Sequence, residues 1–111
     1  MLGKEKRISR SCEYNTVYQQ GRKTPGRYII VFVIPNLTDH NRFGFVTSKK
    51  VGKAVTRNKA RRQLRAIVQT EWDTIKPGYD IVVVVRKNFP GTSFDLIKKD
   101  FSIVMRKAGL C

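Results

Sequence analysis

The apolar residues of the chain recur at intervals that predict three helices. Apolar side chains spaced at i, i+3 and i+4 mark helices over residues 7–20, 55–72 and 94–107. Gly21 ends the first of these helices, and Ser93 is placed to cap the last. The residues that carry the spacing are Tyr14, Val17 and Tyr18 in the first helix, Ala60, Leu64, Ile67 and Val68 in the second, and Phe94, Ile97, Phe101, Val104 and Met105 in the third.

Runs rich in β-branched and aromatic residues predict the strands between the helices. They cover residues 28–34, 42–48 and 79–86, and a short edge strand precedes the turn at Thr24-Pro25-Gly26. Gly44 inside the second run indicates a bulge or a close backbone approach. The last run is apolar at nearly every position, which is typical of a strand covered on both faces, as in parallel pairing. The first run is also apolar on both faces, with Tyr28, Ile30 and Phe32 on one and Ile29, Val31 and Val33 on the other.

The elements follow the order α-β-β-β-α-β-α, which predicts an α+β fold in which helices pack against a mixed sheet. The length of 111 residues suits a single domain over 1–111 and leaves no room for two independent cores. For a parallel pair of strands joined through the 55–72 helix, the general rule predicts a right-handed crossover, as in about 98% of cases.

Charge narrows the possible functions. Lys and Arg number 23 and Asp and Glu number 8, so the formal net charge is +15. Such an excess destabilises a small domain by self-repulsion, and the usual reason to keep it is a polyanionic partner. Nucleic acid is the first expectation and an anionic membrane surface the second. The longest apolar run, residues 28–34, is far shorter than the roughly 20 residues of a spanning helix, and the N-terminus shows no apolar stretch of a secretory signal.

Side chains suited to chemistry are sparse. Cys12 and Cys111 are too few for a disulfide framework, and we expect free thiols in a reducing, cytoplasmic compartment. The single histidine, His40, lies in a polar stretch that offers no second zinc ligand. We therefore expect neither a catalytic residue nor a metal ligand in this chain.

The stretch from residue 41 to residue 70 contains no acidic residue. A solvated helix face usually mixes signs, because i,i+4 pairs of opposite charge stabilise it. This stretch instead repeats like charges at Arg57, Arg61 and Arg65, which costs stability unless an anion joins them, so phosphate binding is favoured over a solvated face. Its nine basic residues are Arg42, Lys49, Lys50, Lys53, Arg57, Lys59, Arg61, Arg62 and Arg65.

The order of residues within this stretch resembles a known signature. Arg57-Asn58-x-x-Arg61-Arg62-x-x-Arg65 resembles the Arg-Asn-Arg signature of the protein subunit of bacterial ribonuclease P. The lead-in Ser48-Lys-Lys-Val-Gly52 is similar to that family's, and the resemblance covers about residues 7–107. It implies a compact two-layer α/β sandwich with a mixed four-stranded sheet, similar to the second domain of ribosomal protein S5. It also implies a left-handed crossover through the Arg-rich helix, against the general rule.

The resemblance implies a function as well. The family's holoenzyme is an endonuclease that removes the 5′ leader of precursor tRNA, with an RNA subunit as catalyst and Mg²⁺ held mainly by that RNA. The partners are then the catalytic RNA subunit and precursor tRNA, without a membrane or a protein partner, and the protein alone is not expected to be catalytic. The residues implied to bind RNA are Lys49, Lys50, Lys53, Arg57, Asn58, Lys59, Arg61, Arg62 and Arg65. Those implied to line the leader-binding cleft are Tyr14, Tyr18, Ile30 and Phe32.

Four residues, Val46, Arg61, Gln63 and Ala66, depart from the family's pattern, and three other functions stay open. Gln63 stands where the family often has an apolar residue, and Val46 stands at a strand position that is often small and polar and faces the cleft. A structural RNA-binding protein would explain the charge without a leader cleft. A free-standing nuclease would need a cluster of carboxylates, and a membrane-surface protein would need liposome binding stronger than RNA binding.

Overall fold

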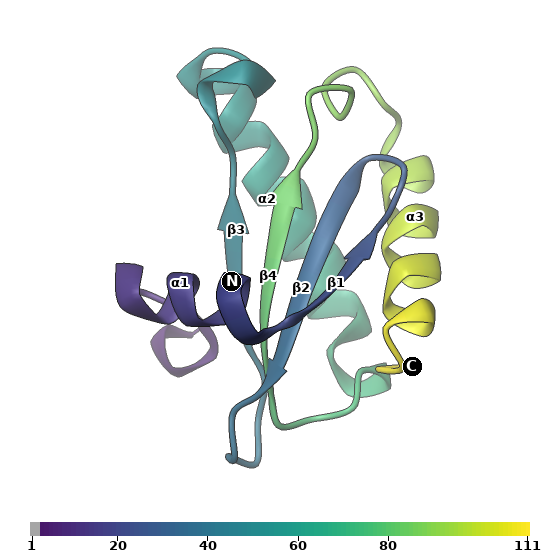
Figure 1. Ribbon diagram of the computed structural model, residues 1–111. Helices are drawn as coiled ribbons and strands as arrows, with labels where there is room; N and C mark the ends of the chain where they lie inside the picture. The colour runs from purple at the N-terminus through teal and green to yellow at the C-terminus, as the bar shows by residue number, and fades with distance from the viewer. Residues whose placement is uncertain (1–2) are drawn as a thin grey trace.

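The computed structural model describes residues 3–111, and within them the elements occur in the predicted order (Figure 1). The helices are α1 (Ser11–Gln20), α2 (Ala54–Glu71) and α3 (Phe94–Lys107). The strands are β1 (Arg22–Pro25), β2 (Ile29–Pro35), β3 (Arg42–Val46) and β4 (Tyr79–Val85). Short 3-10 turns, η1 (Lys4–Lys6), η2 (Lys49–Val51) and η3 (Trp72–Thr74), precede α1 and flank α2. The Ser93 hydroxyl accepts a hydrogen bond from the Leu96 amide, which confirms the predicted cap of α3.

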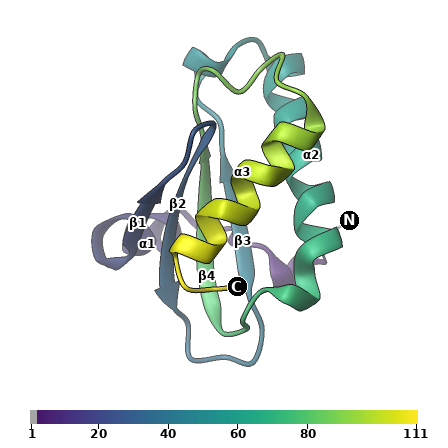
Figure 2. The same cartoon turned by 90° about the vertical axis from the view of Figure 1, so that its right-hand side faces the viewer.

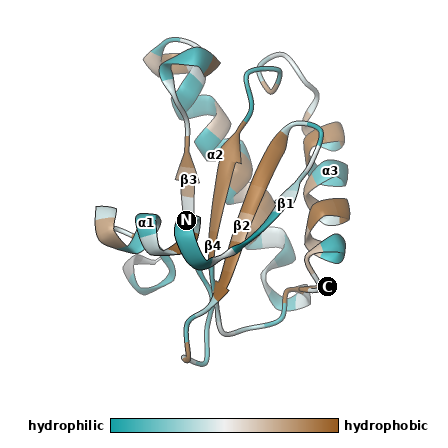
Figure 3. Cartoon of the chain, in the orientation of Figure 1, coloured by the Kyte–Doolittle hydropathy of each residue, from teal (hydrophilic) through white to brown (hydrophobic). Residues whose placement is uncertain are grey.

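The strands form one mixed sheet in the order β1-β2-β4-β3. β4 pairs antiparallel with β2 and parallel with β3, while β1 pairs antiparallel with β2. The central position of β4 explains its unbroken apolar run, because both of its faces are covered. β2 and β4 are hydrophobic along most of their length (Figure 3). The mixed four-stranded sheet is therefore confirmed.

The connection from β3 through α2 to β4 is a left-handed crossover. In Figure 1 the chain leaves the top of β3, descends behind the sheet as α2 and rises again as β4, which lies to the right of β3. The general rule predicted the opposite hand and is wrong here, whereas the family resemblance predicted this one. A right-handed connection would place α2 on the face that carries α1. The likeness to ribosomal protein S5 stays a prediction.

One face of the sheet is covered by α2 and α3, and we call it the closed face (Figure 2). Ile29, Val31 and Val33 of β2 point into this layer and are buried, as their alternation predicted. The other side of the layer is formed by the apolar stripes of the two helices, which contribute Ala60, Leu64, Ile67 and Val68 from α2 and Ile97, Phe101, Val104 and Met105 from α3.

The opposite face is covered by α1 and by Ile8, which precedes it, and we call it the open face. A smaller cluster forms here around the buried residues Ile8, Val17 and Val82. Its remaining members are half-buried: Tyr14, Tyr18, Phe32, Ile34, Val46 and Val84. No helix formed by residues 3–111 has the length and the apolar character needed to span a bilayer.

The first helix begins later than its apolar spacing predicted. Arg7 forms a parallel bridge to Phe43, and the Ile8 amide donates a 3.0 Å hydrogen bond to the Phe43 carbonyl. Residues 7–10 therefore run beside the outer edge of β3 instead of forming a turn of helix. The backbone amide of Arg10 then donates to Glu13 Oε1 at 3.2 Å, which satisfies one free donor where α1 starts.

The turn between β1 and β2 is fixed by the C-terminal helix. The buried carboxylate of Asp100 accepts the backbone amides of Arg27 and Tyr28, at 3.0 and 2.9 Å. A Cβ added at Gly26 would lie 2.5 Å from a methyl carbon of Val104, so α3 packs directly on this turn. The hairpin and α3 therefore hold each other in place.

Candidate nucleic-acid interface

Aromatic side chains from α1 and β2 meet on the open face. Tyr14 and Tyr18 stand one turn apart on α1, and Val17 between them is buried and anchors the helix to the sheet. The rings of Tyr18 and Phe32 meet edge to face with centroids 5.0 Å apart. Three of the four predicted cleft residues therefore lie in one half-buried cluster, which offers aromatic surface to a ligand.

Tyr14 packs directly on the backbone of β3. A Cβ added at Gly44 would lie 2.5 Å from the Tyr14 ring, so the close approach predicted for this glycine is confirmed. The Tyr14 hydroxyl donates a 3.2 Å hydrogen bond to the Ile8 carbonyl. Burial raises the pKa of Tyr14 and of Tyr18 above the ordinary value of 10.0, so both hydroxyls stay protonated at neutral pH.

Ile30 of β2 and Tyr28, which directly precedes the strand, lie apart from the aromatic cluster. Ile30, the fourth predicted cleft residue, is half-buried on the same face of the strand but lies outside the cluster around Tyr14 and Phe32. Tyr28, which the alternation placed with Phe32, packs against the core of the closed face instead. The alternation fails there because Tyr28 precedes the strand, and its amide is bound by Asp100 of α3.

The cluster on the open face is bordered by three cations, of which Arg65 was predicted to bind RNA and Lys23 and Arg7 were not. Lys23 of β1 pairs with Phe32 across the hairpin, and its ammonium lies 6.0 Å from the Phe32 ring centroid. Arg7 and Arg65 line a pocket of about 140 Å³ together with Tyr14 and Gly44. Recognition of the β1–β2 hairpin register could have found Lys23, because it lies directly opposite Phe32.

The arginines of α2 form a row along one side of the helix, as predicted. Arg57, Arg61 and Arg65 are half-buried, and Asn58 and Arg62 beside them are exposed. A shallow depression of about 490 Å³ runs along this row and is lined by Val55, Asn58, Arg61, Arg62 and Arg65. Arg65 also lines the pocket beside Tyr14, so the row on α2 and the aromatic cluster meet at this side chain.

Two arginines of the row differ in their partners. Arg61 donates to the Thr47 hydroxyl at 2.6 Å and to the side-chain oxygen of Asn58, so its guanidinium is held in place. The Nε of Arg57 is buried without an acceptor among residues 3–111. Because this Nε is out of contact with solvent, an anion that approaches the half-buried Arg57 would meet the terminal nitrogens of its guanidinium.

The other predicted RNA-binding residues occupy different positions. Lys49 and Lys50 lie in η2 and Lys53 caps the start of α2, and all three are exposed. Lys59 is also exposed, but it lines a separate pocket with Phe89 and Gln63 instead of the depression along the row. The structure therefore does not bring Lys59 together with the arginine row.

Arg42 was counted among the nine cations of the acid-free stretch, but its charge is neutralised within the fold. Its guanidinium contacts Glu13 at 2.8 Å and Asp80 at 2.5 Å. These hydrogen bonds raise the pKa of Arg42, and the one to Glu13 lowers the pKa of that carboxyl. Asp80 also accepts from the Asn36 amide at 3.0 Å. Arg42 is thus a structural residue that ties α1 to β3 and β4.

Metal-binding side chains are dispersed in the described chain. Residues 3–111 contain no group of three or more His, Cys, Asp or Glu side chains that could hold a metal ion. Cys12 and Cys111 are exposed free thiols, and His40 contacts Asp39 and the carbonyl of Glu5.

Comparisons with known proteins agree with this arrangement. The sequence profile of the family described as ribonuclease P matches residues 2–109. The chain is 46% identical over 110 residues to the ribonuclease P protein component of Syntrophomonas wolfei. The alignment covers 99% of this chain and 92% of that protein. It superposes on a Staphylococcus aureus RNase P protein mutant with defective mRNA degradation activity, with a TM-score of 0.91, 28% identity and coverage of 97% of this chain and 92% of that one. It also superposes on the RNase P protein from Thermotoga maritima, with a TM-score of 0.83, 28% identity and coverage of 90% and 96%. The profile and the relatives span nearly the whole chain, so this chain belongs to the ribonuclease P protein family.

Proposed function

We propose that the chain binds the catalytic RNA subunit of ribonuclease P and the 5′ leader of precursor tRNA. In this role it supports the Mg²⁺-dependent endonucleolytic cut that removes the leader and leaves the mature 5′ end. The observation that carries the proposal is the junction at Arg65, where the arginine row of α2 meets the aromatic cluster of the open face.

The open face suits a single-stranded leader. Single strands bind where aromatic rings offer stacking surfaces beside positive charge. Tyr14, Tyr18 and Phe32 supply the rings, and Lys23 and Arg65 supply the charge at opposite borders. Val46 packs into the same cluster, so at this position the leader meets an apolar contact instead of a hydrogen bond.

The arginine row suits a folded RNA. Arg guanidinium groups match phosphate oxygens in a forked geometry, and successive turns of a helix can follow an RNA backbone. Arg57 has an unpartnered Nε–H, and the orientation of Arg61 is fixed by Thr47 and Asn58. Lys49, Lys50 and Lys53 extend this positive surface beyond the start of α2.

We assign the chemical step to the RNA subunit. Residues 3–111 bring no three His, Cys, Asp or Glu side chains together as metal ligands, and the carboxylates of Glu13, Asp80 and Asp100 are each engaged by N–H donors. The protein's part is to bind and orient the RNA strands, and Mg²⁺ held mainly by RNA supplies the activated water.

A cleavage assay at low Mg²⁺ tests the proposal directly. It combines a bacterial ribonuclease P RNA with precursor tRNA, with and without this protein, and includes a substrate whose leader is one nucleotide long. We expect strong activation by the protein that fades with the short leader. Tight RNA binding without activation would instead identify a structural RNA-binding protein.

The arginine row is tested by substitution, with affinity for the RNA subunit as the measured quantity. We expect Arg57→Ala and Arg61→Ala each to weaken binding of the RNA subunit by about 1–3 kcal/mol, the scale of hydrogen bonds to charged groups. Lys107→Ala, at an exposed position at the end of α3, is the matched control and should bind normally. Unchanged affinity in both row variants would overturn the assignment of the row.

A further inference from the structure

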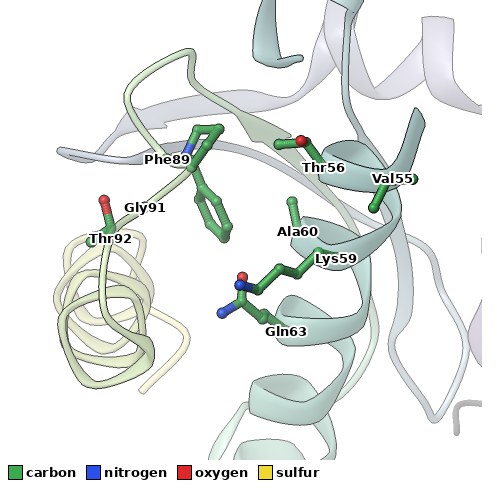
Figure 4. Close-up of a pocket in the computed structure, with 9 residues that line it drawn as sticks. Val55, Thr56, Lys59, Ala60, Gln63, Phe89, Gly91 and Thr92 are labelled. Atoms are coloured by element: carbon green, nitrogen blue, oxygen red, sulfur yellow. The ribbon is translucent and has the colours of Figure 1, made fainter. Parts of the chain in front are cut away.

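A second pocket lies between α2 and the loop that joins β4 to α3. It has a volume of about 300 Å³ (Figure 4). The side chains of Lys59 and Gln63 extend from α2 across the gap toward the Phe89 ring, and Gly91 and Thr92 lie on the opposite loop. The complete lining is Val55, Thr56, Lys59, Ala60, Gln63, Phe89, Pro90, Gly91 and Thr92.

This pocket faces a different direction from the arginine row. Successive residues of an α-helix are rotated by roughly 100° about its axis, so Lys59 and Gln63 each lie about 160° from Arg61. Arg62, at the exposed margin of the row, lies only about 60° from Lys59, so a strand that follows the row can reach this pocket by passing over Arg62. The function proposed above leaves these two side chains unused.

The lining combines one apolar wall with hydrogen-bonding groups. Phe89 and Ala60 are each 1% exposed and close the bottom of the pocket, so the apolar wall open to a ligand is formed by Pro90 and Val55, which are exposed. The Gln63 amide offers both a donor and an acceptor, and the Lys59 ammonium forms no ion pair within residues 3–111. Thr92 donates its hydroxyl to the Asn88 carbonyl, which leaves its oxygen free to accept. A flat apolar wall, an amide and a free cation are the groups that recognise a base and its phosphate.

We propose that this pocket holds one unpaired nucleotide of the RNA subunit. The base lies against Pro90 and Val55, the Gln63 amide bonds to its edge, and the Lys59 ammonium contacts its phosphate. This inference rests on the proposed function, because it takes the RNA bound along the arginine row to be the same molecule that reaches the pocket.

Continuity between the two surfaces favours RNA as the occupant. Val55 lines both the depression along the row and this pocket, and it is 78% exposed on the ridge between them. An apolar side chain at this position is suited to contact a ribose or a base edge as a strand crosses the ridge. The net charge of +15 disfavours an acid-poor protein partner and favours a polyanion that contacts both sides of α2.

Gln63 gives the pocket a feature that the charge pattern does not explain. It stands where the family often has an apolar residue, and its spacing of four residues from Lys59 places both on one side of the helix. An apolar residue would leave the base edge without a hydrogen-bond partner. Base recognition at this pocket is therefore expected to depend on Gln63.

The first test is an NMR titration of the full-length protein with small probes. The probes are AMP, GMP, CMP and UMP, together with ribose 5-phosphate and inorganic phosphate. We expect at least one nucleotide to shift the Gln63 side-chain amide and the backbone amides of Gly91 and Thr92 at lower concentration than ribose 5-phosphate does. Equal shifts from inorganic phosphate would show an anion site only and would overturn the proposal, as would shifts confined to the arginine row.

The second test measures affinity for the RNA subunit. We expect Gln63→Ala and Lys59→Gln each to weaken binding about three- to tenfold, the scale of one or two hydrogen bonds. Gln69→Ala and Lys99→Gln make the same chemical changes at exposed positions outside the pocket and should bind as the unaltered protein does. The Gln63→Ala variant should also lose its response to nucleotides in the titration.

The row variant Arg57→Ala separates failure of this inference from failure of the proposed function. If Arg57→Ala weakens RNA binding and both pocket variants bind normally, the RNA interface stands and the nucleotide pocket is wrong. If the unaltered protein shows no preference for the RNA subunit over unrelated RNA, the proposed function itself fails, and the pocket proposal fails with it. Circular dichroism of each variant confirms that the fold is retained.

Discussion

The open and closed faces of the sheet are built from the same strands but are covered to different extents. On β2, Ile29, Val31 and Val33 are buried under α2 and α3, whereas Phe32 and Ile34 alternate with them and stay half-exposed. Both sets are apolar, so polarity does not distinguish the faces. The difference lies in what covers them: two long helices on one side and a single ten-residue helix on the other.

This difference separates stability from binding. Burial of apolar surface stabilises the fold by roughly 25 cal/mol per Å², and most of that burial is on the closed face. Apolar rings that stay half-exposed on the open face contribute less to stability and keep surface available for a ligand. Substitutions on the two faces should therefore change different measured quantities.

The largest expected effect is on the closed face. The Leu64 side chain of α2 packs in the core of the closed face and is 0% exposed, so Leu64→Ala leaves a cavity there. We expect the free energy of unfolding to fall by about 2–5 kcal/mol. Urea denaturation measures the free energy of unfolding. A smaller loss for Leu64→Ala than for a substitution on the open face would contradict the assignment of stability to the closed face.

Phe32→Ala, on the open face, should affect leader binding more than the free energy of unfolding. We expect it to weaken binding of a precursor tRNA by about 1–3 kcal/mol, because one stacking surface is lost. Its effect on the free energy of unfolding should be smaller than that of Leu64→Ala, since the ring is half-buried. Affinities for substrates with long and one-nucleotide leaders give the measurement, and an equal loss for both would place Phe32 outside the leader site.

Gly44→Ala sharpens the comparison without removing an aromatic ring. The new methyl group would lie 2.5 Å from the Tyr14 ring, so the ring or α1 must move. We expect a loss of about 1–2 kcal/mol in the free energy of unfolding, together with weaker leader binding. Tyr14→Ala in the same chain should restore stability relative to Gly44→Ala alone; continued destabilisation would show that the methyl group clashes elsewhere.

Anions that bind the arginine row of α2 should stabilise the folded protein without changing the packing on either face of the sheet. Phosphate that binds the folded arginine row better than the unfolded chain raises stability by about 1.4 kcal/mol at ten times its Kd. Thermal unfolding at increasing phosphate concentration measures this effect, with sodium chloride as the ionic-strength control. A midpoint that responds equally to both salts would indicate screening instead of a preformed site.

The smallest expected effect concerns the attachment of α1. The hydrogen bond from Arg42 holds the pKa of Glu13 below its ordinary value of 4.5. A carboxylate with a lowered folded pKa stabilises the fold above its unfolded pKa, and this contribution is lost as the pH falls through the folded pKa. We expect Glu13→Gln to cost under about 1 kcal/mol at neutral pH. The difference from the unaltered protein should disappear as the pH falls through the folded pKa of Glu13, and a difference that persists in a fully protonated protein would assign it to packing.

Much of the fold followed from local pattern. The apolar spacing of α2 and α3 gave their bounds to within one residue, because each helix buries one continuous stripe. The alternation in β2 identified a core face and a second apolar face, and the aromatic cluster of Tyr14, Tyr18 and Phe32 follows from it. These features depend on residues close together in the sequence.

The remaining features depend on contacts between distant segments. Residues 7–10 continue the helical spacing, but pairing of Ile8 with Phe43 holds them extended. Arg42 belongs to a basic stretch, yet Glu13 and Asp80, 29 and 38 residues away, neutralise it. The hand of the crossover likewise reflects which face α1 occupies. No local pattern carries this information.

The order of the strands also determines when, during synthesis of the chain, the sheet can form. β4 is the last strand to be synthesised, yet it lies between β2 and β3, which do not touch each other without it. β4 must therefore be synthesised before the sheet can close, and such long-range pairing slows folding. A nascent chain that ends before Tyr79 is restricted to the β1–β2 hairpin and isolated helices. The surface on which the arginine row of α2 meets the aromatic cluster of α1 and β2 therefore takes its folded form only after β4 has been synthesised.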